Sequence, residues 1–181
     1  MRKKINSKQK GKRIEREVVN YFKKKFPEDA DKWMRVPDSG ARMGGKNLPE
    51  NASVYQKITL VGDIITPEWV PFNIECKGVS NFDLFWLLQA RRGKLWRDWE
   101  EELHEQFLAN NRKSILILKA NRKPMLVIVP LDEELISVDQ YSESLVFKGK
   151  YEKYVVVLLN DYIDIDMKRI RKEFYETKYS S

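Results

Sequence analysis

The stretch "FNIECKGVSN", residues 72–81, places a glutamate and a lysine on either side of the only cysteine in the chain. Successive side chains of a β-strand point to opposite faces, so Ile74 and Cys76 share one face while Glu75 and Lys77 share the other. Taken alone, the pattern favours a half-buried strand with a solvent-exposed Glu75–Lys77 pair. The rest of the sequence must decide whether that face carries chemistry.

A second carboxylate lies one predicted strand earlier. Residues 57–66, "KITLVGDIIT", are rich in β-branched side chains and carry Asp63, and the short turn at residues 67–71 makes the two strands hairpin neighbours. Mg²⁺ typically takes one or two carboxylates, several waters and phosphate oxygens. Asp63 and Glu75 fit that role, with the main-chain carbonyl of Cys76 as a further neutral ligand. Lys77 would orient or deprotonate an attacking water, or neutralise charge on a reacting phosphate.

The composition limits the possible classes of protein. The 181 residues are 42% hydrophobic, with a formal net charge of +7 and a pI near 9.3, which indicates one domain with an anionic partner. One histidine and one cysteine exclude a disulfide framework, zinc fingers and His-based zinc catalysis. No apolar run approaches the ~20 residues of a membrane span, and no apolar segment follows the basic N-terminus. We therefore expect a soluble, cytoplasmic protein.

The N-terminal part of the chain combines a basic arm with a helix. Residues 1–12 form the arm, which suits a phosphate backbone, although a solvated tail is the alternative. Residues 12–26 predict an amphipathic helix ended by Pro27, with Ile14, Val18 and Phe22 on its apolar stripe. Glu15 falls within that stripe, so it requires a polar partner.

The remaining sequence predicts further helices and strands. Residues 31–36 suggest a short strand, and residues 37–57 a long loop rich in Gly, Pro, Ser and Asn. Residues 94–110 predict a helix whose apolar stripe belongs to the core or a subunit interface, with His104 on its solvent side. That stripe consists of Leu95, Trp96, Trp99, Leu103 and Phe107. Strands are predicted at residues 114–120, 124–130 and 153–159, and a basic helix at residues 167–178.

These motifs resemble a known nuclease superfamily. "GD" at 62–63 followed by "IECK" at 74–77 is similar to the active-site motif of the PD-(D/E)xK nucleases, an Asp on one strand and (Asp/Glu)-x-Lys on the next. "KGKRIEREVVNYF" at 10–22 and "RVPDSGA" at 35–41 resemble the archaeal-type Holliday junction resolvases within that superfamily. The resemblance implies an α/β fold with a restriction-endonuclease-like αβββαβ core, a mixed central sheet and a C-terminal extension.

The resemblance also implies roles for individual residues. Asp63 and Glu75 would bind metal, Lys77 would be the catalytic lysine, and Glu15 would reach the same metal site from the first helix. Arg35 and Ser39 would contact the scissile backbone. The residues expected to bind DNA are Lys10, Lys12, Arg13, Arg35, Ser39, Arg42 and Lys46. Two features depart from the family, namely a glycine where proline often precedes the first Asp, and the long insertion before Asp63 together with the tail after residue 130.

The expected activity is that of a Holliday junction resolvase, a DNA endonuclease of recombination and repair that makes paired symmetric nicks with one or two Mg²⁺ ions, Mn²⁺ substituting. Its partners would be four-way or branched DNA and a second copy of the chain, and no membrane. The segment "FDLFWLL" at 82–88 is a candidate dimer interface, with simple core as the alternative. Other nucleases of the superfamily, such as restriction-like, flap or repair enzymes, and a non-catalytic nucleic-acid binding module on this fold remain open.

The expected organisation is a single unit in three parts. Residues 1–12 are the basic arm, residues 13–130 the nuclease core with its long loop at 37–57, and residues 131–181 an extension of the same domain. No linker separates the last two parts. An origin in a phage, an archaeal virus or an archaeon would suit such a protein.

Overall fold

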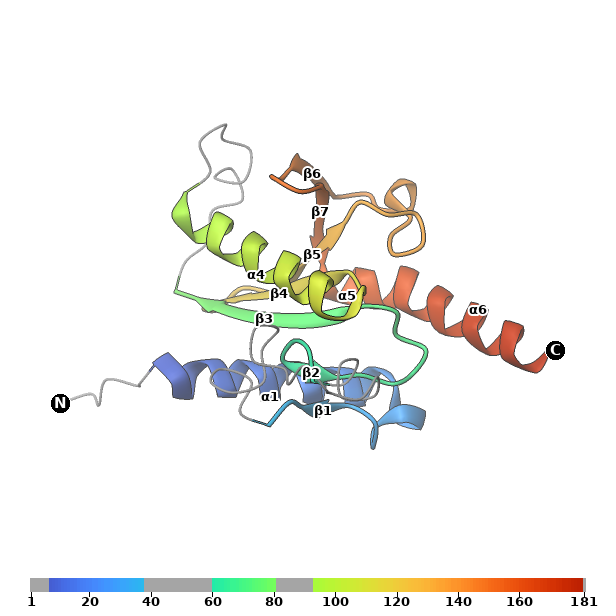
Figure 1. Ribbon diagram of the computed structural model, residues 1–181. Coiled ribbons are helices and arrows are strands. Elements are labelled where there is room, and N and C mark those ends of the chain that lie inside the picture. The colour runs from blue at the N-terminus through green and yellow to red at the C-terminus, as the bar shows by residue number, and fades with distance from the viewer. Residues whose placement is uncertain (1–6, 38–59, 81–92, 181) are drawn as a thin grey trace.

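The computed structural model describes residues 7–37, 60–80 and 93–180 (Figure 1). The described elements run in the order helix, three strands, helix, four strands and C-terminal helices. Their bounds are α1 Ser7–Lys25, η1 Pro27–Asp29, β1 Met34–Arg35, β2 Ile64–Ile65, β3 Asn73–Val79, α4 Lys94–Asn110, β4 Ser114–Ala120, β5 Met125–Pro130, η3 Val138–Gln140, β6 Leu145–Lys148, β7 Lys153–Leu158, α5 Leu159–Tyr162, η4 Ile163–Met167 and α6 Lys168–Tyr179. None of the helices in these ranges is long and apolar enough to cross a membrane.

A mixed five-stranded sheet forms the centre of the fold. Its strand order is β3-β4-β5-β7-β6, with β3 parallel to β4 and the other neighbours antiparallel. The parallel pair is connected through α4, as parallel strands require. The predicted α/β class with a mixed central sheet is therefore confirmed, and β3 lies at one edge of that sheet.

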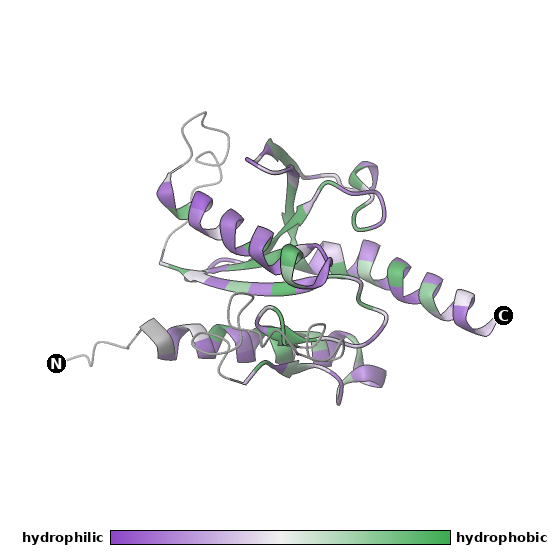
Figure 2. Ribbon diagram, viewed as in Figure 1, coloured by the Kyte–Doolittle hydropathy of each residue, from purple (hydrophilic) through white to green (hydrophobic). Residues whose placement is uncertain are grey.

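Helices cover the sheet on both faces. In β4, Ile115 and Ile117 belong to the core cluster that includes α1, whereas Leu116 and Leu118 belong to a second cluster with Trp96 and other residues of α4. Neighbouring residues of a strand point to opposite faces, so this near-continuous apolar run is what a sheet buried on both sides needs. Figure 2 shows the same layering, with hydrophobic strands between more hydrophilic outer helix surfaces.

Helix α1 packs directly on β3. Its predicted apolar stripe is buried, including Ile14, Val18 and Phe22. At the crossing point a Cβ added to Gly78 would lie 1.9 Å from Cδ1 of Ile14, so a larger residue would require the end of the Ile14 side chain to shift. The helix begins at Ser7 rather than at residue 12, and therefore includes part of the predicted basic arm.

Helix α4 has the predicted bounds, residues 94–110. Trp96, Trp99 and Leu103 are buried as core residues, in agreement with the stripe. Leu95 is 46% exposed, so the prediction that it belongs to the stripe is wrong for this residue at the first turn. His104, expected on the solvent side of the helix, is partly exposed, and its ring stacks on that of the exposed Tyr151 with 3.8 Å between ring centroids.

The strands around Asp63 differ from the prediction. Strand β2 contains only Ile64 and Ile65 in the described part of the chain, and its ladder partner is β1, not β3. The expected hairpin of two long strands is therefore wrong. Strand β6, which the sequence reading missed within a polar segment, pairs with β7 at the far edge of the sheet.

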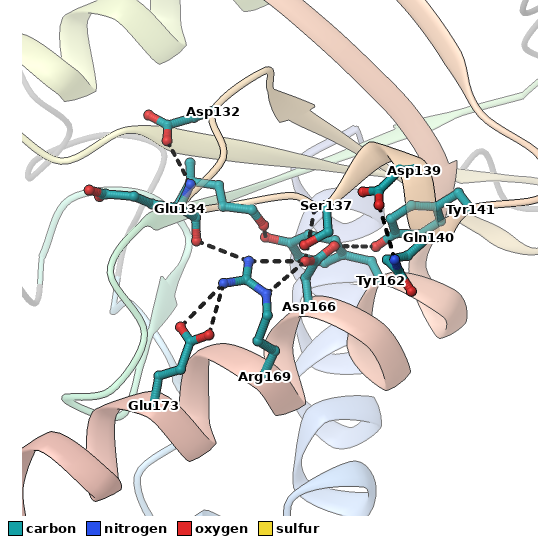
Figure 3. Close-up of polar contacts among 11 residues, drawn as sticks. Asp132, Glu134, Ser137, Asp139, Gln140, Tyr141, Tyr162, Asp166, Arg169 and Glu173 are labelled. Atoms are coloured by element: carbon teal, nitrogen blue, oxygen red, sulfur yellow. Dashed lines mark hydrogen bonds and ion pairs between the residues drawn. The ribbon is translucent and has the colours of Figure 1, made fainter.

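The chain after residue 130 adds strands β6 and β7 to the same sheet and then ends in helix α6. A fully buried carboxylate, Asp166, accepts hydrogen bonds from the backbone N–H of Ser137, from the Tyr141 hydroxyl at 2.6 Å and from the Arg169 guanidinium (Figure 3). Arg169 also donates to the Glu134 carbonyl and to Glu173. This network attaches α6 to the segment that follows β5. The division at residue 130 remains a prediction.

Candidate active site

Strand β3 carries the central pair of side chains in a buried setting. Ile74 and Cys76 face the α1 core cluster, while Glu75 and Lys77 face α4, as strand parity predicts. Glu75 is only 4% exposed, so the alternative of a solvent-facing Glu–Lys pair is wrong. A buried carboxylate needs compensating partners, and its surroundings therefore indicate whether it has a chemical role.

Asp63 is attached to the free edge of β3. Its backbone N–H donates to the Ile74 carbonyl at 2.8 Å, and its Oδ2 accepts from the backbone N–H of Cys76 at 2.9 Å. It lies in the bend just before β2 and not within a strand. The two carboxylates predicted to meet are thus brought together, although through a bend beside an edge strand and not through a hairpin ladder.

Gly62 explains both the bend and the missing proline. Its φ of +84° lies in the left-handed region, which proline cannot adopt because its ring fixes φ near −65°. A Cβ at this position would lie 2.7 Å from the Ile74 carbonyl oxygen. The glycine that departs from the family pattern is therefore required for the approach of Asp63 to β3.

We expect Gly62→Ala to lower the free energy of unfolding by about 1–3 kcal/mol, because the new side chain is strained at positive φ and clashes with backbone. Gly11→Ala is the matched control. That glycine lies within α1 and its nearest neighbour would be 3.7 Å away, so alanine should stabilise by about 0.5–1 kcal/mol. Urea unfolding measures both changes. Wild-type stability for Gly62→Ala would contradict the assigned backbone conformation.

The Cys76 carbonyl is directed toward the same edge. In a strand the N–H and C=O of one residue point to the same side, and the Cys76 N–H points to Asp63. Its carbonyl is therefore placed to act as the predicted neutral ligand. The thiol has a different role, since burial, followed by the charge of Asp63, raises its pKa and keeps it a neutral core group.

Glu75 is held by two partners and lies next to a like charge. Its Oε1 accepts from Lys77 Nζ at 2.8 Å and its Oε2 from Gln106 Nε2 at 2.7 Å. Burial, with the charge of Asp63 as the second cause, raises the pKa of Glu75 to about 8. Burial also raises the pKa of Asp63, partly opposed by its hydrogen bonds. It is unfavourable for two neighbouring buried carboxyls to be ionised at the same time. A divalent cation bound to both would offset their negative charge.

Lys77 bridges two carboxylates. Its Nζ lies 2.8 Å from Glu75 Oε1 and 2.6 Å from Glu102 Oε2. Burial alone would lower the pKa of Lys77, but the charges of Glu75 and Glu102 outweigh it, so the pKa is raised above its ordinary value. The side chain is therefore a protonated ammonium, suited to neutralising phosphate charge. This arrangement favours charge neutralisation over deprotonation of water.

Helix α4 supplies site residues that the sequence reading missed. Besides Glu102, it provides Gln106, which donates to Glu75 and accepts from the Ser114 hydroxyl at 2.8 Å. Gln106 lies seven residues after Trp99 and thus on the buried stripe of the helix, where a polar side chain is unexpected. The same signal that singled out Glu15 in α1 was therefore present in α4.

Glu15 faces inward, as its place on the stripe predicts, and has found a polar partner. Arg35 Nη1 donates to its Oε2 at 3.0 Å and also to the Val36 carbonyl. The charge of Glu15 contributes to raising the pKa of Asp63, so the two side chains belong to one electrostatic neighbourhood. Its role as a metal ligand, and that of Arg35 in contacting DNA, remain predictions.

Several predicted residues are not placed at this centre. Lys10, Lys12 and Arg13 lie on the first turns of α1, and Ser39, Arg42 and Lys46 lie outside the described residues. In residues 7–37, 60–80 and 93–180 no three Asp, Glu, His or Cys side chains converge closely enough to hold a metal by themselves. The fit is instead to an ion held by Asp63, Glu75 and a backbone carbonyl, with substrate and water oxygens completing its shell.

The raised pKa of Glu75 predicts a pH-dependent stability in EDTA. Between about pH 4.5 and 8 the folded protein keeps a proton that the unfolded chain has lost, so stability falls as the pH rises through this window. We expect a loss of about 1–3 kcal/mol, reduced in Glu75→Gln and by saturating Mg²⁺ in the wild type. Exposed Glu133→Gln is the control. An unchanged slope in Glu75→Gln, measured by urea unfolding, would contradict the assignment.

Comparison with protein-family models identifies the family of this chain. Residues 6–179 match the family described as "Phage putative PDDEXK endonuclease". No curated protein and no solved structure matches the chain. The family match covers α1, the strands around Asp63 and Glu75, α4 and the C-terminal helix.

Proposed function

The chain belongs to the phage PDDEXK endonuclease family, and from that membership we propose that it is a Mg²⁺-dependent DNA endonuclease acting on four-way or otherwise branched DNA. The observation that carries the proposal is the convergence of Asp63 and Glu75 at the free edge of β3, with Lys77 bound to Glu75. The sequence motif, an Asp followed by Glu-x-Lys, therefore coincides with an arrangement of side chains that suits phosphodiester hydrolysis.

Three groups would hold the metal: the carboxylates of Asp63 and Glu75 and the Cys76 carbonyl. Bound there, a divalent ion supplies Lewis acidity and lowers the pKa of a coordinated water. Gln106 keeps Glu75 in the orientation needed, since it occupies Oε2 while Oε1 meets Lys77. If Glu75 binds a cation, Glu102 would remain as the ion-pair partner of the Lys77 ammonium.

In the hydrolytic step a water oxygen forms a bond to phosphorus and one P–O ester bond breaks. The water proton passes to solvent or to a phosphate oxygen, and the leaving oxygen takes up a proton. Lys77, fully protonated, donates to the phosphate oxygens as negative charge develops on them. Arg35 is proposed to contact the adjoining backbone while Glu15 fixes its guanidinium.

The choice of branched DNA is supported by the sequence resemblance of the first helix and of the segment after β1. Resolution of a four-way junction requires two symmetric cuts, so we propose a two-fold homodimer. The candidate interface at residues 82–88 and the loop residues Ser39, Arg42 and Lys46 fall outside the described residues.

The test is Mg²⁺-dependent cleavage of an end-labelled four-way junction beside a duplex of the same sequence. We expect paired, symmetrically placed nicks in the junction, little cleavage of the duplex and none in EDTA. Cleavage confined to one duplex sequence would contradict the junction preference but not the nuclease. DNA binding without cleavage under every metal condition would instead indicate a non-catalytic binding module.

A further inference from the structure

One end of the sheet gathers several elements close to the proposed catalytic centre. Strands β3 and β4 run parallel and end together, with Val79 opposite Ala120 in the ladder. The β4–β5 turn follows at this end of the sheet. The first half of α1 lies at the same end, since Ile14 packs beside Gly78. Figure 1 shows the N-terminal end of α4 at the same side.

This end of the molecule is basic. We call the exposed cations Lys94, Arg97, Arg122 and Lys123 the basic rim; the first two begin α4 and the last two form the β4–β5 turn. Within the described part of the chain none of these four side chains forms an ion pair. The acidic side chains closest along these elements are partly engaged elsewhere: Glu17 pairs with Lys119 at 3.4 Å and Glu101 with Lys150 at 2.7 Å, while Asp98 is exposed on α4. Four exposed cations that form no ion pair with any described residue favour an anionic ligand.

The basic rim lies within reach of DNA bound at the catalytic centre. Lys77 is opposite Leu118 in the ladder, so the turn begins about three residues, or about 10 Å, farther along the sheet. A duplex carries one charge per about 1.7 Å of axis, so 10 Å corresponds to about six phosphate charges. A duplex with one phosphate at Lys77 would bring neighbouring phosphates over the turn.

The chemistry of the basic rim favours double-stranded DNA. Proteins that grip single strands place exposed aromatic side chains along a basic groove for base stacking. The largely exposed aromatics of the described residues are Tyr151 and Tyr179, on the β6–β7 turn and at the end of α6. The tryptophans of α4, Trp96 and Trp99, are buried. As far as the described residues go, the basic rim therefore combines charge with no neighbouring exposed aromatic ring, which suits a phosphate backbone.

We infer that the basic rim binds the phosphate backbone of the DNA duplex that flanks the cleaved bond, and that it does so without reading sequence. This inference rests on the proposed function, because it assumes that the nearby centre acts on DNA. It extends the DNA-contacting surface from α1 to α4 and the β4–β5 turn. Arg122 and Arg97 can each grip a phosphate with two donors, whereas the lysines act as point charges.

The experiment measures binding in an Asp63→Asn background, where cleavage does not interfere. The double variant Arg122→Glu/Lys123→Glu should bind a short labelled duplex about tenfold more weakly. Its salt dependence, the slope of log affinity against log salt, should fall by about two, because each phosphate contact contributes about 0.9. Arg97→Gln alone should lower the slope by about one.

The matched control is Lys148→Glu/Lys153→Glu. These exposed lysines lie opposite each other on β6 and β7, at the sheet edge remote from β3, and change the same number of charges. An equal loss of affinity in rim and control variants would overturn the inference in favour of net charge alone. Unchanged duplex binding in the rim variants, or a loss confined to single-stranded DNA or to RNA duplex, would also overturn it. Failure of this inference can be distinguished from failure of the proposed function. If a rim variant that retains Asp63 cleaves DNA at saturating DNA concentration, the proposed nuclease activity is supported whatever the basic rim binds.

Discussion

Replacing Asp63 by asparagine is expected to lower the rate of DNA cleavage by at least about 10²–10³-fold while DNA binding is retained. The amide keeps the shape of the side chain but removes the charge that would hold a divalent ion beside Glu75. The Cys76 N–H can still donate to the remaining oxygen, so the bend before β2 should be preserved. Single-turnover cleavage at saturating DNA, with binding measured separately, distinguishes loss of chemistry from loss of affinity.

The control for this prediction is Asp31→Asn, which removes the same charge from an exposed turn. Cleavage by that variant should be close to wild type. Because burial raises the pKa of Asp63, the asparagine variant should also be at least as stable as the wild type in EDTA, where an ionised carboxylate is unfavourable. Full cleavage activity in Asp63→Asn would place the catalytic centre elsewhere in the chain.

Replacing Lys77 by methionine is expected to lower cleavage by about 10²–10³-fold, with a small effect on affinity for DNA. Methionine fills a similar volume but carries no charge to offset that developing on the phosphate. Glu75 and Glu102 would then lose the ammonium that lies 2.8 and 2.6 Å from them. Their pKa values should rise further, which would weaken metal binding at neutral pH and move the cleavage rate toward higher pH.

Lys113→Met provides a closely matched control. Lys113 also bridges two carboxylates, Asp132 at 3.0 Å and Glu152 at 3.1 Å, but at the opposite end of β4. Its loss should affect stability and leave cleavage within a few-fold of wild type. If the two lysine variants lost cleavage equally, the effect would be one of folding and not of the site. Lys77→Arg should not restore full activity, because the planar guanidinium does not replace a compact ammonium between two carboxylates.

Local sequence patterns predicted much of the fold. The 94–110 helix and the strands around the 121–123 turn were predicted within a residue because their apolar periodicity is strong and their ends carry turn residues. Parity along β3 placed Glu75 and Lys77 together on one face. The prediction of one long strand around Asp63 was wrong. The segment is rich in β-branched residues, but the positive φ of Gly62 interrupts the strand. Strand β6 was missed since its four residues carry little periodic signal.

The partners within the site depend on contacts between distant parts of the chain, which local patterns do not encode. Glu15 was singled out by its place on an apolar stripe, yet only the fold shows that Arg35 is its partner. Glu102 and Gln106 reach Glu75 and Lys77 because α4 crosses the opposite face of β3, a packing arrangement that depends on the whole sheet. The sequence thus predicted the shared face of Glu75 and Lys77 and the inward position of Glu15, but not the side chains that hold them in place.

The most direct test of the central claim is an anomalous difference map from crystals of the protein soaked in Mn²⁺. We predict one or two peaks at the free edge of β3, bound by the carboxylates of Asp63 and Glu75 beside the Cys76 carbonyl, and lost in Asp63→Asn. A Mn²⁺ ion bound elsewhere, with Asp63 still beside Glu75 and Glu75 still bound to Lys77, would contradict the account.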